Sequence, residues 1–166
     1  MPISRPSPSR SPAGFTLVEL VVVMIIIGVM SVVVLPRFDL FKGFDQVGYR
    51  DKVKATLEYA RKAAVARRRY TCVSLSGNDV LVTADQGVPE SYAGGCPASA
   101  LPLPAEDRAC SPVTVGKVCA PSGVSLTGTA TLTFSPLGKP SSVGAYTVTG
   151  DSAENITVEA ESGYVH

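Results

Sequence analysis

The sequence has no tryptophan, and its one histidine is the last residue, His166. Catalytic groups of Ser, His and Asp or of Cys and His need an internal histidine that neighbouring elements can orient. The four cysteines form no CxxC pair and have no histidine near them, which argues against a metal site and against a thioredoxin-like centre. A phosphate-binding loop and a dinucleotide fingerprint are missing as well. We therefore expect no enzyme activity, no cofactor and no metal.

A strong excess of charge of one sign is also missing, since the net charge is +1. The field of the whole chain therefore does not favour nucleic acid as a partner. Charge is nevertheless uneven, because residues 36–69 have ten basic and four acidic side chains, whereas residues 70–166 have three basic and nine acidic ones. Segments of about +6 and about −6 can attract each other in an array of copies, or both can be solvated surfaces.

The N-terminus combines a basic stretch with a long apolar run. Arg5 and Arg10 lie among Pro and Ser residues without any acid, and an almost unbroken apolar run extends from Leu20 to Leu35. A helix over residues 15–35 would rise roughly 30 Å, enough to cross a bilayer core. The basic residues predict that its N-terminus stays in the cytoplasm. A small-residue cleavage site does not follow the run, which argues against an ordinary secretory signal peptide.

Glu19 interrupts the apolar sequence. A carboxylate at bilayer depth costs about 2.5–3.5 kcal/mol and usually has a partner. Cleavage between Gly14 and Phe15 would create such a partner, the new α-amine of Phe15, in the same chain or in a neighbouring subunit. The alternative is an ordinary anchor whose Glu19 side chain reaches the membrane interface.

The segment Gly14 to Leu20, GFTLVEL, resembles the class III signal of type IV prepilins and type II secretion pseudopilins. The resemblance implies that a prepilin peptidase cuts after Gly14 and methylates Phe15, and that Glu19 acts in assembly. Pro36 lies where this family has a helix-perturbing proline, and its missing amide hydrogen predicts a kink. The implied partners are the prepilin peptidase, the inner membrane, and other pilins or pseudopilins that pack on the N-terminal helix.

A second helical pattern follows Gly48. Apolar side chains recur at helical spacing and form one stripe, at Val53, Leu57, Ala60 and Ala64. This pattern predicts that the helix continues to about Arg69.

Basic side chains gather at the end of this helix, at Arg61, Lys62, Arg67, Arg68 and Arg69. Lysine and arginine can contact phosphates, so a DNA-binding uptake pilin is one alternative. However, aromatics and glycines are not interleaved with them, and cations suit a helix C-terminus on their own. A solvated helix end is therefore favoured, and nucleic acid is not an expected partner.

Short alternating runs separated by Gly, Pro and Ser predict strands over residues 70–76, 80–83, 113–119, 124–126, 129–134, 145–149 and 155–160. We expect an α+β protein in which a long N-terminal helix, half transmembrane and half amphipathic, packs on an antiparallel sheet. The predicted parts are a leader peptide (1–14), a transmembrane half-helix (15–35), a periplasmic half-helix (36–69) and a β-rich head (70–166).

All four cysteines lie in the head, at Cys72, Cys96, Cys110 and Cys119. An even number in an exported segment predicts disulfides, but four cysteines allow three pairings and the sequence does not choose among them. Cys72–Cys96 with Cys110–Cys119 is favoured because each bond closes a short loop. Cys96–Cys110 with Cys72–Cys119 is the alternative.

Two C-terminal segments extend the resemblance. Residues 133–140, TFSPLGKP, resemble the F-x-P-x-G-x-P segment of the FimT/GspH-like minor pilins, and residues 156–165, ITVEAESGYV, resemble their closing strand and turn. Ser162 replaces the usual Thr of that turn. Residues 84–122 match no segment of the family, and adjacent Glu106 and Asp107 lie there with no apolar pocket expected around them.

The resemblance favours a minor pilin that initiates assembly of a type IV pilus, held in the inner membrane by one span with a periplasmic head before it joins the fibre. The plain secretion-type member of the family usually lacks cysteines. The four cysteines of this chain therefore point to a mannose-sensitive haemagglutinin (MSHA) type of pilus. A GspH-like minor pseudopilin of a type II secretion system is the alternative.

Overall fold

The computed structural model describes residues 14–34 and 40–166. The chain divides into two compact units at the boundary between Phe38 and Asp39, and each unit is described by itself. Most of the predicted leader and the predicted kink at Pro36 lie outside the described residues.

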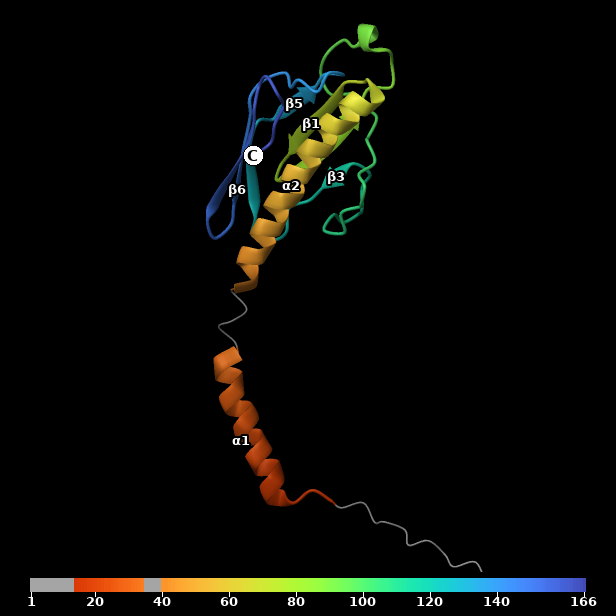
Figure 1. Ribbon diagram of the computed structural model, residues 1–166. Helices are drawn as coiled ribbons and strands as arrows, with labels where there is room; N and C mark the ends of the chain where they lie inside the picture. The colour runs from red at the N-terminus through yellow and green to blue at the C-terminus, as the bar shows by residue number, and fades with distance from the viewer. Residues whose placement is uncertain (1–13, 35–39) are drawn as a thin grey trace, which may run out of the picture. The chain divides into compact units, whose positions relative to one another are not determined.

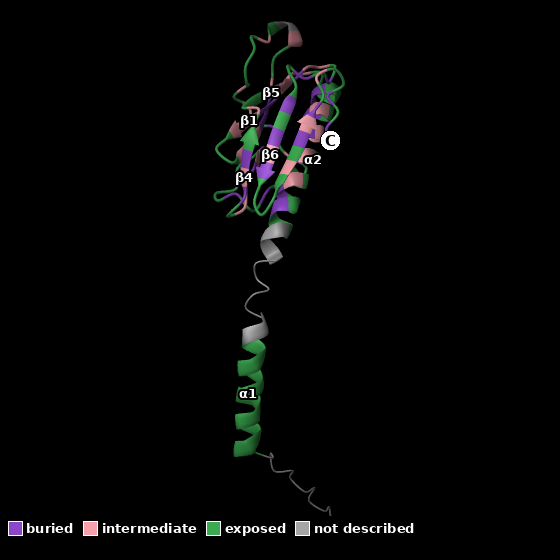
Figure 2. Cartoon of the chain, turned by 90° about the vertical axis from the view of Figure 1, so that its left-hand side faces the viewer, coloured by how far each residue is buried: buried purple, intermediate pink, exposed green. Residues whose placement is uncertain are grey.

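The first unit contains helix α1 (Leu17–Val34). Every side chain from Gly14 to Ser31 is exposed, as Figure 2 shows for the helix. Within residues 14–34 and 40–166, no helix combines the length and the apolar character that crossing a membrane requires. The predicted span over residues 15–35 includes Leu35, which is not described, and it stays a prediction.

The second unit begins with helix α2 (Leu40–Arg67). Its predicted stripe is confirmed, because Val53, Leu57, Ala60 and Ala64 are all fully buried. Gln46 and Tyr49 continue the same stripe toward the start of the helix and are also buried. The helix ends where Arg68 takes a left-handed φ of 52°, a common way to terminate a helix.

Seven strands and one short 3-10 helix follow α2. They are β1 (Thr71–Ser76), β2 (Asp79–Ala84), η2 (Pro89–Ser91), β3 (Lys117–Val118), β4 (Ser125–Gly128), β5 (Thr131–Phe134), β6 (Gly144–Thr149) and β7 (Ala153–Val158). The strands form two antiparallel sheets, with the orders β3-β2-β1-β5 and β4-β6-β7. Figure 1 shows α2 lying against them, and α2 contacts strands of both.

The single predicted sheet is therefore divided in two. The chain passes from one sheet to the other at Thr129 and Ala130, inside the predicted strand 129–134. The amide of Thr129 still donates to Ala145 of β6, whereas the carbonyl of Ala130 accepts from Leu75 of β1. The division gives α2 two sheet surfaces to cover.

The predicted strand 113–119 is mostly loop, and only Lys117–Val118 pair as β3. Gly116 explains the difference, because it takes a φ of +75°, which suits glycine and few other residues. A Cβ at Gly116 would lie 2.7 Å from the carbonyl oxygen of Val82 and 2.8 Å from that of Leu101. The loop before Gly116 thus leaves the sheet at a close backbone crossing.

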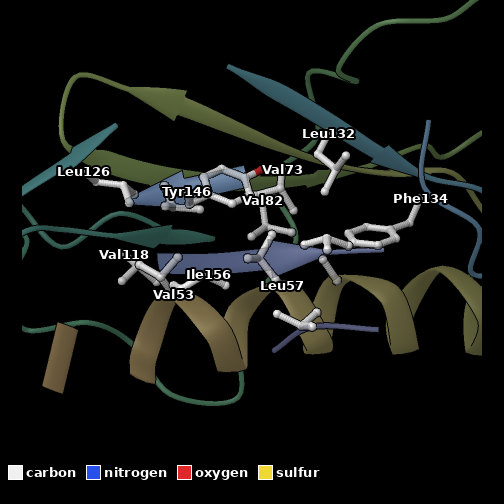
Figure 3. Packing of buried hydrophobic residues seen from close by; sticks show 14 of the residues in the cluster. Val53, Leu57, Val73, Val82, Val118, Leu126, Leu132, Phe134, Tyr146 and Ile156 are labelled. Carbon is white, nitrogen blue, oxygen red and sulfur yellow. The ribbon is translucent and has the colours of Figure 1, made fainter. Parts of the chain in front are cut away.

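The core lies between α2 and the two sheets. Figure 3 shows Val53 and Leu57 of α2 pointing toward side chains from the strands. The largest fully buried apolar side chains are Tyr146, Phe134, Leu57, Leu126, Leu132 and Ile156. The phenylalanine, leucine and isoleucine side chains each contribute about 1.5–3 kcal/mol by leaving water, so this unit has a hydrophobic core of its own.

Candidate functional site

The start of α1 is held by a cap that sequence analysis did not identify. The amide of Glu19 donates to Oγ1 of Thr16 at 3.2 Å, and the amide of Leu20 donates to the carbonyl of Thr16 at 3.2 Å. Thr16 is therefore the N-cap residue. Thr followed three residues later by Glu is the capping-box pattern, so the sequence contained the signal.

Gly14 and Phe15 lie immediately ahead of this cap, outside the helix. Phe15 is 83% exposed, and a Cβ placed at Gly14 would meet no atom within 4 Å. The two residues that flank the predicted cleavage site are therefore exposed and non-helical. Glu19 lies in the first turn of α1, where a negative charge interacts favourably with the helix dipole. Cleavage of the bond would place a cationic amine next to the same turn.

In the head, Asp107 is more constrained than the sequence predicted. Its side chain is only 6% exposed, whereas neighbouring Glu106 is exposed. Asp107 accepts hydrogen bonds from Nζ of Lys52 at 2.9 Å, from the amide of Ala109 at 3.1 Å and from the amide of Cys119 at 3.1 Å. Burial alone raises the pKa of Asp107, but the hydrogen bonds from Lys52 and the two amides outweigh it, and the pKa lies below its ordinary value.

A cavity of about 500 Å³ lies beside Asp107, between α2 and the loop that precedes β3. Four of its lining residues share one face of α2, and others, including Glu106 and Asp107, come from the loop. The helix residues are Lys52, Ala55, Thr56 and Tyr59. The expectation that Glu106 and Asp107 lack a pocket was therefore wrong.

The cysteines form the disulfides Cys72–Cys96 and Cys110–Cys119. All four belong to the described part of the chain, and none is free. This is the pairing that short loop closure favoured. The first bond ties the loop around Cys96 to Cys72 in β1. The second bond closes the loop from Cys110 to Cys119, and Asp107 also accepts a hydrogen bond from the amide of Cys119.

The basic side chains at the end of α2 have different surroundings. Lys62 pairs with Glu58 at 3.5 Å, Arg67 is exposed, and Arg68 terminates the helix. Arg61 instead lies against the C-terminal turns. Among the described residues, no group of His, Cys, Asp and Glu could hold a metal ion.

The two C-terminal segments that resemble minor pilins meet on α2. A Cβ at Gly138 would lie 3.5 Å from Nε of Arg61, and one at Gly163 would lie 3.1 Å from Cδ of the same side chain. The same added Cβ at Gly163 would lie 2.5 Å from the carbonyl oxygen of Gly138. The glycines therefore let both turns approach each other and Arg61 closely.

Comparisons with known proteins agree with this arrangement. Residues 9–35 match the family model of the prokaryotic N-terminal methylation motif, and residues 51–162 match that of the type II transport protein GspH. None of the curated proteins matches the chain.

Two crystal forms of the type IV minor pilin FimU from Pseudomonas aeruginosa (strain PAO1) have a similar fold. One has a TM-score of 0.54 at 16% identity, covering 76% of this chain and 90% of that one. The other has a TM-score of 0.50 at 17% identity, covering 72% and 89%. The α+β prediction of a helix on an antiparallel head is thereby confirmed as the pilin fold. Because the GspH model covers more than half of the sequence behind a prepilin-type N-terminus, the chain belongs to the GspH family of type IV pilin-like proteins.

Proposed function

We propose that this chain is the precursor of a minor pilin. A prepilin peptidase cuts it between Gly14 and Phe15 and methylates the new amine of Phe15. Residues 15–35 then cross the inner membrane, and the mature subunit joins a type IV pilus through its N-terminal helix. The supporting observation is the junction itself, where an exposed, non-helical Gly14–Phe15 bond is followed directly by the Thr16 cap.

Glu19 has two tasks in this proposal. In the isolated chain its amide completes the cap. In the assembled fibre its carboxylate neutralises the amine of Phe15, in the same subunit or in a neighbour, which offsets the cost of placing an acid in apolar surroundings. This pairing requires prior cleavage, because the nitrogen of Phe15 is a neutral amide until the peptide bond to Gly14 is cut.

The experiment is an intact-mass measurement of the chain extracted from membranes. Processing predicts loss of residues 1–14 and addition of one methylene. Gly14→Leu should leave the leader in place. Its mass should then exceed that of the wild-type chain made in cells without the peptidase only by the difference between a leucine and a glycine residue. A wild-type chain that begins at Met1 in cells with active peptidase would contradict the proposal.

A pseudopilin of a type II secretion system is the second candidate, and the GspH family model favours it. The two disulfides are the feature that favours an MSHA-type pilus instead. Deletion of the gene separates the two functions: loss of surface pili supports the first, and accumulation of secreted proteins in the periplasm supports the second.

A further inference from the structure

The head has a second cavity, of about 350 Å³. It shares no lining residue with the cavity beside Asp107. Its walls come from the residue just before β1, the loop after η2, and the end of β5 with the turn that follows it. The lining residues are Tyr70, Tyr92, Gly94, Gly95, Thr133, Ser135, Lys139, Pro140 and Ser141. Its volume falls in the range of about 300–1,000 Å³ that small-molecule sites occupy.

One wall is a pair of stacked aromatic rings. The rings of Tyr70 and Tyr92 lie 4.0 Å apart and 11° from parallel. The hydroxyl of Tyr92 donates to the carbonyl of Gly95, and the nearby disulfide Cys72–Cys96 ties this loop to β1. The ring pair is therefore held in place before any ligand arrives, which reduces the entropy lost on binding.

Two serines among the lining residues have hydroxyl groups that already accept backbone hydrogen bonds. Oγ of Ser135 accepts from the amide of Lys139 at 3.2 Å, and Oγ of Ser141 accepts from the amide of Thr133 at 3.2 Å. Because a hydroxyl has one hydrogen and two lone pairs, each of the two serines can still donate one hydrogen bond and accept another. A ligand with its own hydroxyls would complement both.

The charge of the cavity argues for a neutral ligand. Lys139 is the one charged residue among those that line the cavity in the described structure, and its Nζ is paired with Glu161 at 2.7 Å. An anion would have to compete with that carboxylate. Pro140 is the one purely aliphatic side chain among the lining residues in the described structure, which does not favour an apolar peptide.

We propose that this cavity binds a neutral saccharide. The C–H face of one sugar ring lies on the free face of the Tyr70–Tyr92 pair, because an aromatic face is electron-rich and attracts partly positive hydrogens. The sugar hydroxyls exchange hydrogen bonds with Ser135 and Ser141. The minor pilin head would thus give the fibre a glycan-binding surface, independently of how the subunit is processed.

Saturation-transfer-difference NMR tests the proposal on the full-length chain in a zwitterionic detergent that has no sugar headgroup. The probes are glucose, galactose, mannose, N-acetylglucosamine and the disaccharides of each, with glucuronate and tetraproline as anionic and peptide probes. At least one neutral sugar should receive saturation, and glucuronate and tetraproline should not. Absence of transfer to every neutral sugar, or preferential transfer to glucuronate or tetraproline, would overturn the proposal.

Variants then place the sugar in the cavity. Tyr92→Ala should weaken binding about three- to tenfold, and Tyr92→Phe should retain most of it because the ring remains. Tyr164→Ala is the matched aromatic control, since Tyr164 stacks on His166 and does not line the cavity.

Ser141→Ala should also weaken binding, whereas neighbouring Ser142→Ala should not. Non-reducing mass spectra and circular dichroism establish that each variant keeps both disulfides and its fold. Unchanged binding by folded Tyr92→Ala, or an equal loss in Tyr164→Ala, would show that the sugar binds elsewhere and refute the assignment.

Discussion

Lys52 of α2 donates a 2.9 Å hydrogen bond to the buried carboxylate of Asp107, 55 residues further along the chain. The two side chains differ greatly in exposure, at 53% for Lys52 and 6% for Asp107. The carboxylate also accepts from the amide of Ala109, which precedes Cys110, and from the amide of Cys119, the partner of Cys110 in the disulfide. One acid therefore attaches the least regular part of the head to its longest helix.

Asp107→Asn should lower the free energy of unfolding by about 2 kcal/mol. The amide keeps one acceptor oxygen but turns an NH₂ group toward a backbone amide, which leaves buried donors without a partner. Lys52→Met should cost less than about 1 kcal/mol, because the ammonium is half exposed. Denaturant unfolding with both disulfides intact measures both values.

Glu106→Gln is the control for this pair, since Glu106 is the adjacent carboxylate and is exposed. It should change stability by less than about 0.5 kcal/mol. A larger loss from Lys52→Met than from Asp107→Asn would mean that the helix side chain, and not the loop carboxylate, organises this contact.

The pKa of Asp107 also predicts how stability depends on pH. Burial raises this pKa and the hydrogen bonds from Lys52, Ala109 and Cys119 lower it, with a net value below the ordinary one. The unfolded chain therefore binds a proton at higher pH than the folded chain does. The resulting stabilisation is present above the ordinary carboxyl pKa and disappears as pH falls through the folded pKa.

Unfolding free energies of the wild type and Asp107→Asn, measured from neutral to strongly acidic pH, test this dependence. The difference between them should shrink as the medium is acidified below the ordinary carboxyl pKa. A difference that stays constant over that range would contradict ionisation of Asp107 as its source.

Much of the fold follows from local pattern. The stripe from Val53 to Ala64 is buried because helical spacing puts those side chains on one face. The division into two sheets does not follow from local pattern, because it depends on where Thr129 and Ala130 find partners 16 residues ahead and 55 residues behind in sequence. Alternation along a strand predicts a buried face but not which strand lies beside it.

The head cavities show the same limit more sharply. Asp107 lies in an irregular loop, and one of its hydrogen-bond donors is Lys52, which is distant in sequence. The Tyr70–Tyr92 stack likewise brings together a residue just before β1 and a residue of a long loop. At the N-terminus, by contrast, Thr16 and Glu19 act within one helical turn. The spacing of these two residues is therefore enough to predict the cap from sequence.

Thr16 and Glu19 can be separated by mutation. Glu19→Gln keeps a side chain that the capping box tolerates but removes the charge that would pair with the amine of Phe15. We expect this variant to be processed and inserted into the membrane, yet to be missing from purified fibres. Immunoblots of membranes and of sheared pili measure both quantities.

Thr16→Ala makes the opposite change. It removes the cap, at a cost of about 1 kcal/mol in helix stability, and leaves the carboxylate in place. This variant should still enter fibres. Equal incorporation of Glu19→Gln and wild type would refute charge pairing, and equal failure of both variants would point to helix capping as the requirement.

Gly163 and Gly77 form a natural pair for testing the contact between the two C-terminal turns. Their φ angles are nearly equal, +65° and +63°, so an alanine at either position meets the same backbone strain of about 1–2 kcal/mol. Their surroundings differ, because a Cβ at Gly77 meets nothing within 4 Å, whereas one at Gly163 lies 2.5 Å from the carbonyl oxygen of Gly138.

Gly163→Ala should therefore cost about 1–3 kcal/mol more than Gly77→Ala, the usual penalty of forcing an extra carbon into a packed site. The excess measures the contact alone, because the strain common to both positions cancels in the comparison. Denaturant unfolding of the two variants gives the difference. Equal losses would mean that the turns can separate freely, and the glycine of the S-G-Y-V segment would then be required only for its backbone angle.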